Sequence, residues 1–475
     1  MKRIAIAAML SIALMAMMSP LEAAETKESG IARKAVTLFS EGKYKEMTGY
    51  FDSTMTKAAP PERLRAIWTS LAGQTGKFER IVGDSSFAYG NYRIVLVTCK
   101  FQKTLLDVKI VLDKSFKIAG LFFVPARQNQ FEKSGNEAAK NNKSGEVSRK
   151  TGYISRDVTF PNRKGGVELA GTLTLPDSTR KLPAVLLVAG SGRNDRNETV
   201  AGHAVFKAIA DYLASRGIAV LRYDKRGVGK STGNYADATT EDFASDALAG
   251  VEYLAGLREI DHRKIGIIGH SEGGEVAPMV ANESRSVAFV VLMAGPGVQG
   301  YRIILSQIAA IDRESGMSDS SVNANVALEN RILKTVMSVK DSSRAARELK
   351  VLLTGKAGET EVEADASIRE LLSPWYRTFL SYDPRPALRK LRCPVLAIWG
   401  SKDLQVPPKE NLPAVREALK SGSSGNYRVV EIPGLNHLFQ EAKTGSPFEY
   451  GTIAEDISPK ALDLIGDWIV KQTAK

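Results

Sequence analysis

The sequence predicts an α/β fold with a mostly parallel sheet, preceded by a small α+β domain. Three observations lead to this fold class. The 475 residues are too many for one ordinary hydrophobic core. Helix-like segments precede β-rich runs in the first part of the chain, and short β-rich runs alternate with helix-length segments after a polar break. A composition that is 43% hydrophobic and 25% charged excludes a mainly disordered chain or one with many membrane spans.

The N-terminus has the pattern of a bacterial secretory signal. A positively charged start and an apolar run over residues 4–18 are followed by small residues near Ala23. The apolar run is short for a membrane span and ends at Ser19-Pro20, so a membrane anchor is the less favoured alternative. We therefore predict a cleaved signal peptide over 1–23 and a periplasmic or secreted protein without stable membrane insertion.

The small α+β domain is predicted over residues 25–127. Helix-like stretches at 35–39 and 62–71 precede β-rich runs at 92–101, 105–112 and 118–124. In this pattern the segment resembles small cystatin-like or NTF2-like domains. Residues 128–152 are polar with little apolar content, which predicts a linker.

The second domain is predicted over residues 153–475. Its β-rich runs at 184–188, 219–223, 265–268 and 287–293 alternate with helix-length segments at 205–216, 242–257 and 275–282. This alternation predicts a mostly parallel sheet wrapped by helices. The alternation stops near Gly300 and resumes at 394–399, with a stretch of helical character between. We predict a helical insertion at about 301–388.

Two segments of the chain match Gly-x-Ser-x-Gly, one around Ser231 and one around Ser271. The motif carries a catalytic serine only where a strand, a sharp turn and a helix follow one another. The apolar run 265–268 leads directly into Gly269, and a helix-forming segment follows Ser271. Ser231 lies in a glycine-rich loop with no helix behind it. The sequence therefore predicts Ser271 as a nucleophile and Ser231 as a structural residue.

A serine hydroxyl needs an imidazole to take its proton and a carboxylate to orient that imidazole. Of the four histidines, His437 lies in a loop after the β-rich run 427–431, near the C-terminus. Asp403 follows another apolar run and lies between Ser271 and His437 in the sequence, which is the chain order this arrangement requires. We predict Asp403 as the orienting acid and His437 as the base.

Acyl transfer also needs N–H donors for the oxyanion that develops at the attacked carbonyl. One donor is expected at the residue after the nucleophile, Glu272, and the other in the loop after the third strand of the domain. That loop contains Gly190-Ser191-Gly192, whose glycines allow the backbone to approach a ligand. We predict the backbone N–H groups of Glu272 and Ser191 as the donors, with that of Gly192 as the alternative to Ser191.

Other ligand classes are not favoured by the sequence. The net charge of +12 comes from scattered lysines and arginines, so nucleic acid is not an expected partner. Gly-Lys-Ser at 229–231 does not make a phosphate-binding loop, because Asp224 stands where its first glycine would be. Cys99 and Cys393 are far apart and imply no disulfide framework. We expect no cofactor or metal, and the oligomeric state is left open.

The second domain resembles the α/β-hydrolase superfamily, specifically bacterial esterases and serine-aminopeptidase-like hydrolases. The motifs that carry the resemblance are 188–192, 223–231, 269–273 and 400–407. The resemblance implies the same roles for Ser271, Asp403 and His437, and it implies that the insertion is a helical cap. Many relatives have His-Gly at the oxyanion loop, where this chain has Ala189-Gly190. In the cap, residues 375–379 include aromatic side chains that either line an acyl site or pack within the cap.

The expected activity is hydrolysis of a small-molecule carboxylic ester through an acyl-enzyme. An aminopeptidase-like enzyme that cleaves an amide with the same triad is the alternative. A hydrolase-like binding protein without activity is the less favoured third reading, because Ser, Asp and His are all present in the required order.

Overall fold

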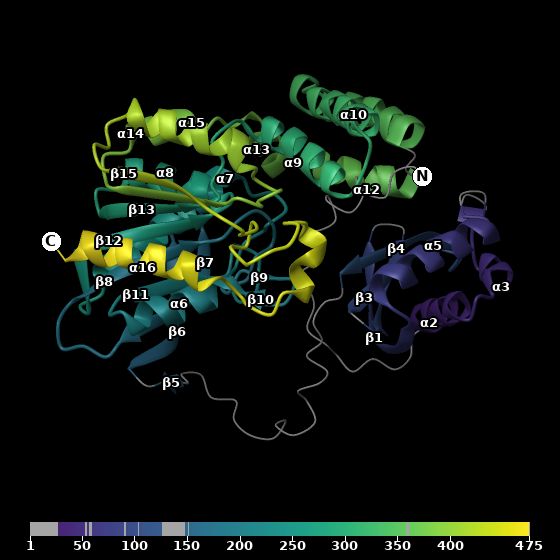
Figure 1. Cartoon of the computed structure of the whole chain (residues 1–475), viewed down its shortest axis with the longest axis horizontal. Coiled ribbons are helices and arrows are strands. Elements are labelled where there is room, and N and C mark those ends of the chain that lie inside the picture. The colour runs from purple at the N-terminus through teal and green to yellow at the C-terminus, as the bar shows by residue number, and fades with distance from the viewer. Residues whose placement is uncertain are drawn as a thin grey trace. The chain divides into compact units, whose positions relative to one another are not determined.

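The computed structural model describes residues 27–52, 55–56, 59–89, 92–102, 104–125, 148–150, 152–357 and 361–474. The predicted signal peptide over 1–23 lies outside these residues, as does most of the predicted linker. The described chain forms a small unit and a larger unit, each with its own sheet and hydrophobic core (Figure 1).

The small unit consists of helices followed by an antiparallel sheet, which is the predicted α+β order. Its elements are α2 (Lys27–Ser40), α3 (Tyr44–Thr48), α5 (Pro61–Thr75), β1 (Phe78–Tyr89), β2 (Tyr92–Phe101), β3 (Leu105–Leu112) and β4 (Ile118–Pro125), with the strands paired in chain order. Ala32, Val36 and Phe39 recur at helical spacing on α2 and are buried in the core of this unit. Strand β1 was not predicted, because its sequence mixes charged residues, glycine and serines without clear alternation.

The larger unit contains a nine-stranded, mostly parallel sheet in the order β15-β14-β13-β12-β8-β11-β7-β6-β5. The strands are β5 (Ser148–Lys150), β6 (Tyr153–Asn162), β7 (Val167–Pro176), β8 (Leu182–Val188), β11 (Ala219–Tyr223), β12 (Ile260–His270), β13 (Val287–Met293), β14 (Val395–Gly400) and β15 (Tyr427–Ile432). The strands from β15 to β11 are parallel, which confirms the predicted fold class. The antiparallel edge of β7, β6 and β5 was not predicted, and β5 falls in the predicted linker.

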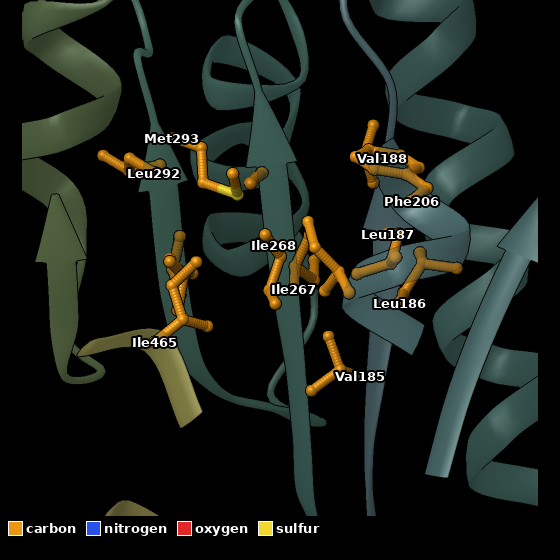
Figure 2. Packing of buried hydrophobic residues seen from close by; sticks show 14 of the residues in the cluster. Val185, Leu186, Leu187, Val188, Phe206, Ile267, Ile268, Leu292, Met293 and Ile465 are labelled. Atoms are coloured by element: carbon orange, nitrogen blue, oxygen red, sulfur yellow. The ribbon is translucent and has the colours of Figure 1, made fainter. Parts of the chain in front are cut away.

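Helices cover both faces of this sheet (Figure 1). One face carries α6 (Val205–Ser215) and α16 (Pro459–Thr473), and the other carries α7 (Thr240–Gly256), α8 (Gly273–Glu283) and α15 (Pro408–Lys420). The central strands are apolar on both faces, as expected for parallel strands buried between helices. Figure 2 shows Leu186 and Ile268 of neighbouring strands in this core, together with Phe206 of α6 and Ile465 of α16.

A helical insertion separates β13 from β14 in the sequence, within the range where the insertion was predicted. It comprises α9 (Gly300–Glu314), α10 (Asp319–Ser338), α11 (Ser342–Val351), a π-helical turn (Leu352–Ala357), α12 (Glu361–Leu371), α13 (Pro374–Ser381) and α14 (Arg385–Lys390). Three helices begin at side-chain caps, because Ser318, Asp341 and Ser373 each accept a hydrogen bond from a backbone N–H of the first turn. Within the described residues, we find no helix with the length and apolarity needed to cross a membrane.

The strand order determines where loops meet at the carboxyl edge of the sheet. From β8 the chain passes to β11 on one side and then to β12 on the other side of β8. The carboxyl ends of β8 and β12 therefore lie next to each other at a point where the strand order reverses, which is where open α/β sheets bind ligands. The loop with Ser191 follows β8 and Ser271 follows β12, so the topology brings these two predicted site residues together.

Candidate active site

Ser271 lies on a sharp turn between a strand and a helix. Strand β12 ends at His270, helix α8 begins at Gly273, and Ser271 has a positive φ of 52°. This backbone conformation is strained for a residue with a side chain, and such strain is concentrated at functional sites. Glycine is required at 273, where a Cβ atom would lie 2.0 Å from the carbonyl oxygen of Val188. The local structure is therefore the strand-turn-helix context expected for the Ser271 motif.

Ser231, in the second Gly-x-Ser-x-Gly match, is buried in a loop, and its hydroxyl both donates and accepts a hydrogen bond. Its Oγ donates to the carbonyl oxygen of Asp224 at 2.6 Å and accepts from the backbone N–H of Ala170 at 2.9 Å. These bonds join the loop after β11 to strand β7. The hydroxyl of Ser231 therefore satisfies buried backbone groups.

Asp403 and His437 meet across the loops that follow β14 and β15. Nδ1 of His437 lies 2.8 Å from Oδ2 of Asp403, and both residues are buried, at 4% and 2% exposure. Oδ1 of Asp403 accepts the backbone N–H groups of Gln405 and Val406, each at 2.8 Å. Because these donors hold the carboxylate, Asp403 can orient the imidazole so that Nε2 points away from it.

The loop of His437 is organised by the buried side chain of Asn436. Its Oδ1 accepts the backbone N–H groups of Leu438 at 3.0 Å and Gln440 at 2.9 Å, and its amide donates to the side-chain oxygen of Gln440 at 3.0 Å. Asn436 is 0% exposed, so these bonds are shielded from water. The loop is thereby closed on itself around His437.

His270 connects the Ser271 turn to the His437 loop. Its Nε2 lies 3.0 Å from the carbonyl oxygen of His437, and the two imidazole rings are 4.8 Å apart between centroids. No hydrogen bond joins Ser271 Oγ to His437 within the ranges that the structure describes. Ser271 and the backbone of His437 are thus brought to the same place by a third residue that directly precedes Ser271.

The partner of His270 is Glu198, a residue that the sequence did not indicate. Oε1 of Glu198 lies 2.9 Å from Nδ1 of His270, and Glu198 is 2% exposed. Both ring nitrogens of His270 face acceptors, which is satisfied only by the protonated imidazolium. Burial acts to lower the pKa of His270, but the carboxylate of Glu198 and the carbonyl of His437 outweigh it and raise that pKa. Glu198 and His270 therefore form a buried hydrogen-bonded pair next to the Ser271 turn.

Glu198 also shapes the predicted oxyanion loop. Its Oε1 accepts the backbone N–H of Gly190 at 2.6 Å, so this N–H is not available to a substrate. A Cβ atom at Gly190 would lie 3.0 Å from Cβ of Ser271, which shows how closely the loop packs against the turn. The backbone N–H groups of Ser191 and Glu272 donate to no other described residue. Both predicted donors are therefore free to bind an oxyanion.

Glu275, on the first turn of α8, carries a second buried carboxyl group that the sequence did not indicate. It is 0% exposed, and its two carboxyl oxygens have no partner among the described residues. Burial raises the pKa of Glu275 well above its usual range, and the nearby carboxylates of Glu272 and Glu241 raise it further. Burial thus favours the protonated form of Glu275 in the folded protein.

Glu275→Met is expected to raise the free energy of unfolding by about 1–3 kcal/mol at pH 7, because the buried polar group without a partner is replaced by an apolar one of similar shape. A raised carboxyl pKa stabilises the fold below the unfolded value of 4.5, and this contribution is lost as the pH rises towards the folded value. The gain should accordingly be larger at pH 8 than at pH 5 in urea unfolding. A gain that does not change with pH would contradict a raised pKa of Glu275.

A surface cleft of about 540 Å³ lies at the opposite end of the sheet from Ser271. It is lined by residues around the amino ends of β8 and β12, including Leu182 and Arg258, and by none of the predicted site residues. Within the described parts of the chain, no group of three or more His, Cys, Asp or Glu side chains is arranged to hold a metal ion.

The fold and the strand-turn-helix motif define an enzyme of the α/β-hydrolase class. Residues 185–446 match the profile of the alpha/beta hydrolase family, and the chain belongs to this family. It is a serine hydrolase. Residues 32–121 match the profile of a family described as a protein of unknown function (DUF3887).

Among curated proteins, the chain is 27% identical over 411 residues to esterase EstD of Thermotoga maritima, which covers 86% of this chain and 87% of that one. It is 31% identical over 159 residues to esterase FrsA of Vibrio cholerae, across 33% of this chain and 35% of the relative. Among solved structures, the α/β hydrolase GrgF from a Penicillium species is 18% identical with a TM-score of 0.44, and the match covers 68% of this chain and 99% of that one.

Proposed function

We propose that the protein is a carboxylesterase that hydrolyses small-molecule esters through an acyl-enzyme on Ser271. The observation that carries this proposal is the buried hydrogen bond between His437 and Asp403, at the same edge of the sheet as the strained Ser271 turn. The similarity to esterase EstD over most of both chains supports ester hydrolysis as the activity. No observation favours an amide substrate over an ester.

In the proposed acylation step, Oγ of Ser271 attacks the ester carbonyl carbon while Nε2 of His437 takes the hydroxyl proton. The negative charge on the carbonyl oxygen is stabilised by the N–H groups of Glu272 and Ser191. Asp403 accepts the hydrogen bond from Nδ1 and stabilises the imidazolium that forms. His437 then protonates the departing alcohol, and the acyl group remains on Ser271.

In the proposed deacylation step, His437 takes a proton from water, and the resulting hydroxide attacks the acyl carbonyl. The same two N–H groups stabilise the second oxyanion. The bond to Ser271 Oγ breaks, the serine regains its proton from His437, and the carboxylic acid leaves. The proposed cycle needs only water as a co-substrate.

We also propose that this reaction takes place in the periplasm or outside the cell. The support is the sequence pattern over residues 1–23, a positive start and an apolar run that ends in small residues. The signal would be removed before the enzyme meets its substrate.

A comparison of matched ester and amide substrates tests the proposed activity. The purified protein is expected to hydrolyse short p-nitrophenyl esters and to show little turnover of the corresponding aminoacyl p-nitroanilides. A fluorophosphonate probe should label the folded protein, because labelling needs an activated serine. Faster turnover of the amide would favour the aminopeptidase-like alternative, and a folded protein without labelling or turnover would favour a binding role.

A further inference from the structure

The side chain of Glu272, the residue after the nucleophile, is buried and accepts three hydrogen bonds from separate parts of the larger unit. Oε1 accepts from the hydroxyl of Thr240 at 2.8 Å and from the indole N–H of Trp375 at 2.6 Å. Oε2 accepts from Nζ of Lys225 at 3.0 Å. Glu272 is 1% exposed and Lys225 is 3% exposed, so the ion pair is shielded from solvent.

The donors come from the sheet side and from the cap. Thr240 begins helix α7, and Lys225 lies in the loop after β11, where its Nζ also donates to the carbonyl oxygen of Gly190 at 2.7 Å. Trp375 belongs to α13 of the cap insertion. One carboxylate therefore joins the oxyanion loop, the Ser271 turn and the cap.

Trp375 is well suited to hold the cap in one position. Its ring stacks on Phe379 of the same helix with centroids 5.4 Å apart and planes 13° apart, which restricts the orientation of the indole. An N–H donated to a buried carboxylate is a charge-assisted bond, and removing one donor leaves part of the charge without a partner. The bond from Trp375 is the hydrogen bond that links α13 to Glu272.

We propose that Trp375 is a positioning residue that holds the cap against the Ser271 turn through its hydrogen bond to Glu272, an interaction called the latch below. We propose that the latch limits the length of the acyl chains that reach Ser271. The inference rests on the proposed ester hydrolysis. The backbone N–H of Glu272 is a proposed oxyanion donor, and the side chain held by Trp375 belongs to the same residue. A cap that is released from Glu272 leaves more space beside Ser271 and a less well-held donor.

Trp375→Phe tests the latch, because it removes the indole N–H and retains an aromatic ring to stack on Phe379. Thr240→Val is the matched variant, since it removes the other donor to the same oxygen, Oε1, from the sheet side. We expect Trp375→Phe to lower kcat/KM for p-nitrophenyl acetate by about tenfold, as small displacements of reacting groups do. The ratio of kcat/KM for the decanoate ester to that for the acetate should rise at least threefold, an order-of-magnitude expectation from added space at the acyl site.

Thr240→Val should lower kcat/KM for the acetate ester and for the decanoate ester by a similar factor. The ratio of the two kcat/KM values should therefore stay at the wild-type value. Hydrogen exchange gives a second readout that a purely structural effect on Glu272 would not move. The backbone amides of α13 should exchange faster in Trp375→Phe and not in Thr240→Val. The proposed role of Trp375 is wrong if Trp375→Phe and Thr240→Val have the same decanoate-to-acetate ratio of kcat/KM and the same hydrogen-exchange pattern in α13. Absence of ester turnover in the wild-type protein would instead overturn the proposed function.

Discussion

Ser271→Ala is expected to lower kcat for ester hydrolysis by on the order of 10⁶-fold, the loss seen when the nucleophile of a serine hydrolase is removed. The reason is chemical, because alanine cannot form the proposed acyl-enzyme and the variant would retain only the proposed oxyanion donors and binding contacts. Stability should change little, since Ser271 Oγ makes no hydrogen bond to another described residue. Initial rates with p-nitrophenyl butyrate and labelling by a fluorophosphonate probe measure the loss.

Ser231→Ala is the matched control for this prediction, because Ser231 occupies the second Gly-x-Ser-x-Gly match. Its hydroxyl satisfies the carbonyl of Asp224 and the N–H of Ala170, both buried. The variant should keep its hydrolytic activity and lose about 1–3 kcal/mol of unfolding free energy, the cost of leaving buried polar groups without partners. Loss of labelling in Ser231→Ala with labelling retained in Ser271→Ala would reverse the assignment of the nucleophile.

The sequence predicted the parts of the site that depend on local context and chain order. Ser271 was distinguished from Ser231 by the strand before it and the helix after it, and both elements are present as β12 and α8. Asp403 and His437 were chosen as residues that follow strands in the required order, and their side chains are 2.8 Å apart. Such features are visible in the sequence because strand-loop boundaries leave an apolar run followed by polar residues.

The supporting charges of the site were not predicted, because their partners are distant in the sequence. Glu198 and His270 are 72 positions apart, and Trp375 is 103 positions from Glu272. A single acidic or basic residue in a loop looks the same whether it is solvated or buried against a partner. Only the three-dimensional arrangement shows which of them are paired.

The antiparallel strands of the larger sheet were missed for a different reason. Strands β6 and β7 lie at one side of the sheet, and the only buried residues of β6 are Tyr153, Phe160 and Asn162. Their sequences lack the continuous apolar runs of the central strands, such as β13. The predicted parallel strands were recognised by those runs.

Asp403→Asn is expected to lower kcat by about 10⁴-fold with little change in KM, through the tautomer of His437. Oδ1 of Asp403 accepts two backbone N–H groups, from Gln405 and Val406. In the variant the single amide oxygen must occupy this place, because an NH₂ group there would face two donors. The NH₂ group then donates to Nδ1 of His437 and places the imidazole proton on Nε2, where it blocks proton transfer from Ser271.

A second Asp–His contact in the protein provides the control for this prediction. Nδ1 of His203 lies 3.3 Å from Oδ1 of Asp456, and Nε2 of His203 lies 2.8 Å from the carbonyl oxygen of Tyr450. Asp456→Asn makes the same chemical change at a histidine with no proposed part in proton transfer, so kcat should remain close to that of the wild type. Equal losses in the two variants would indicate a general effect on folding. A normal kcat in Asp403→Asn would mean that Asp403 does not orient the base, because an imidazole with Nε2 protonated cannot accept the proton of Ser271.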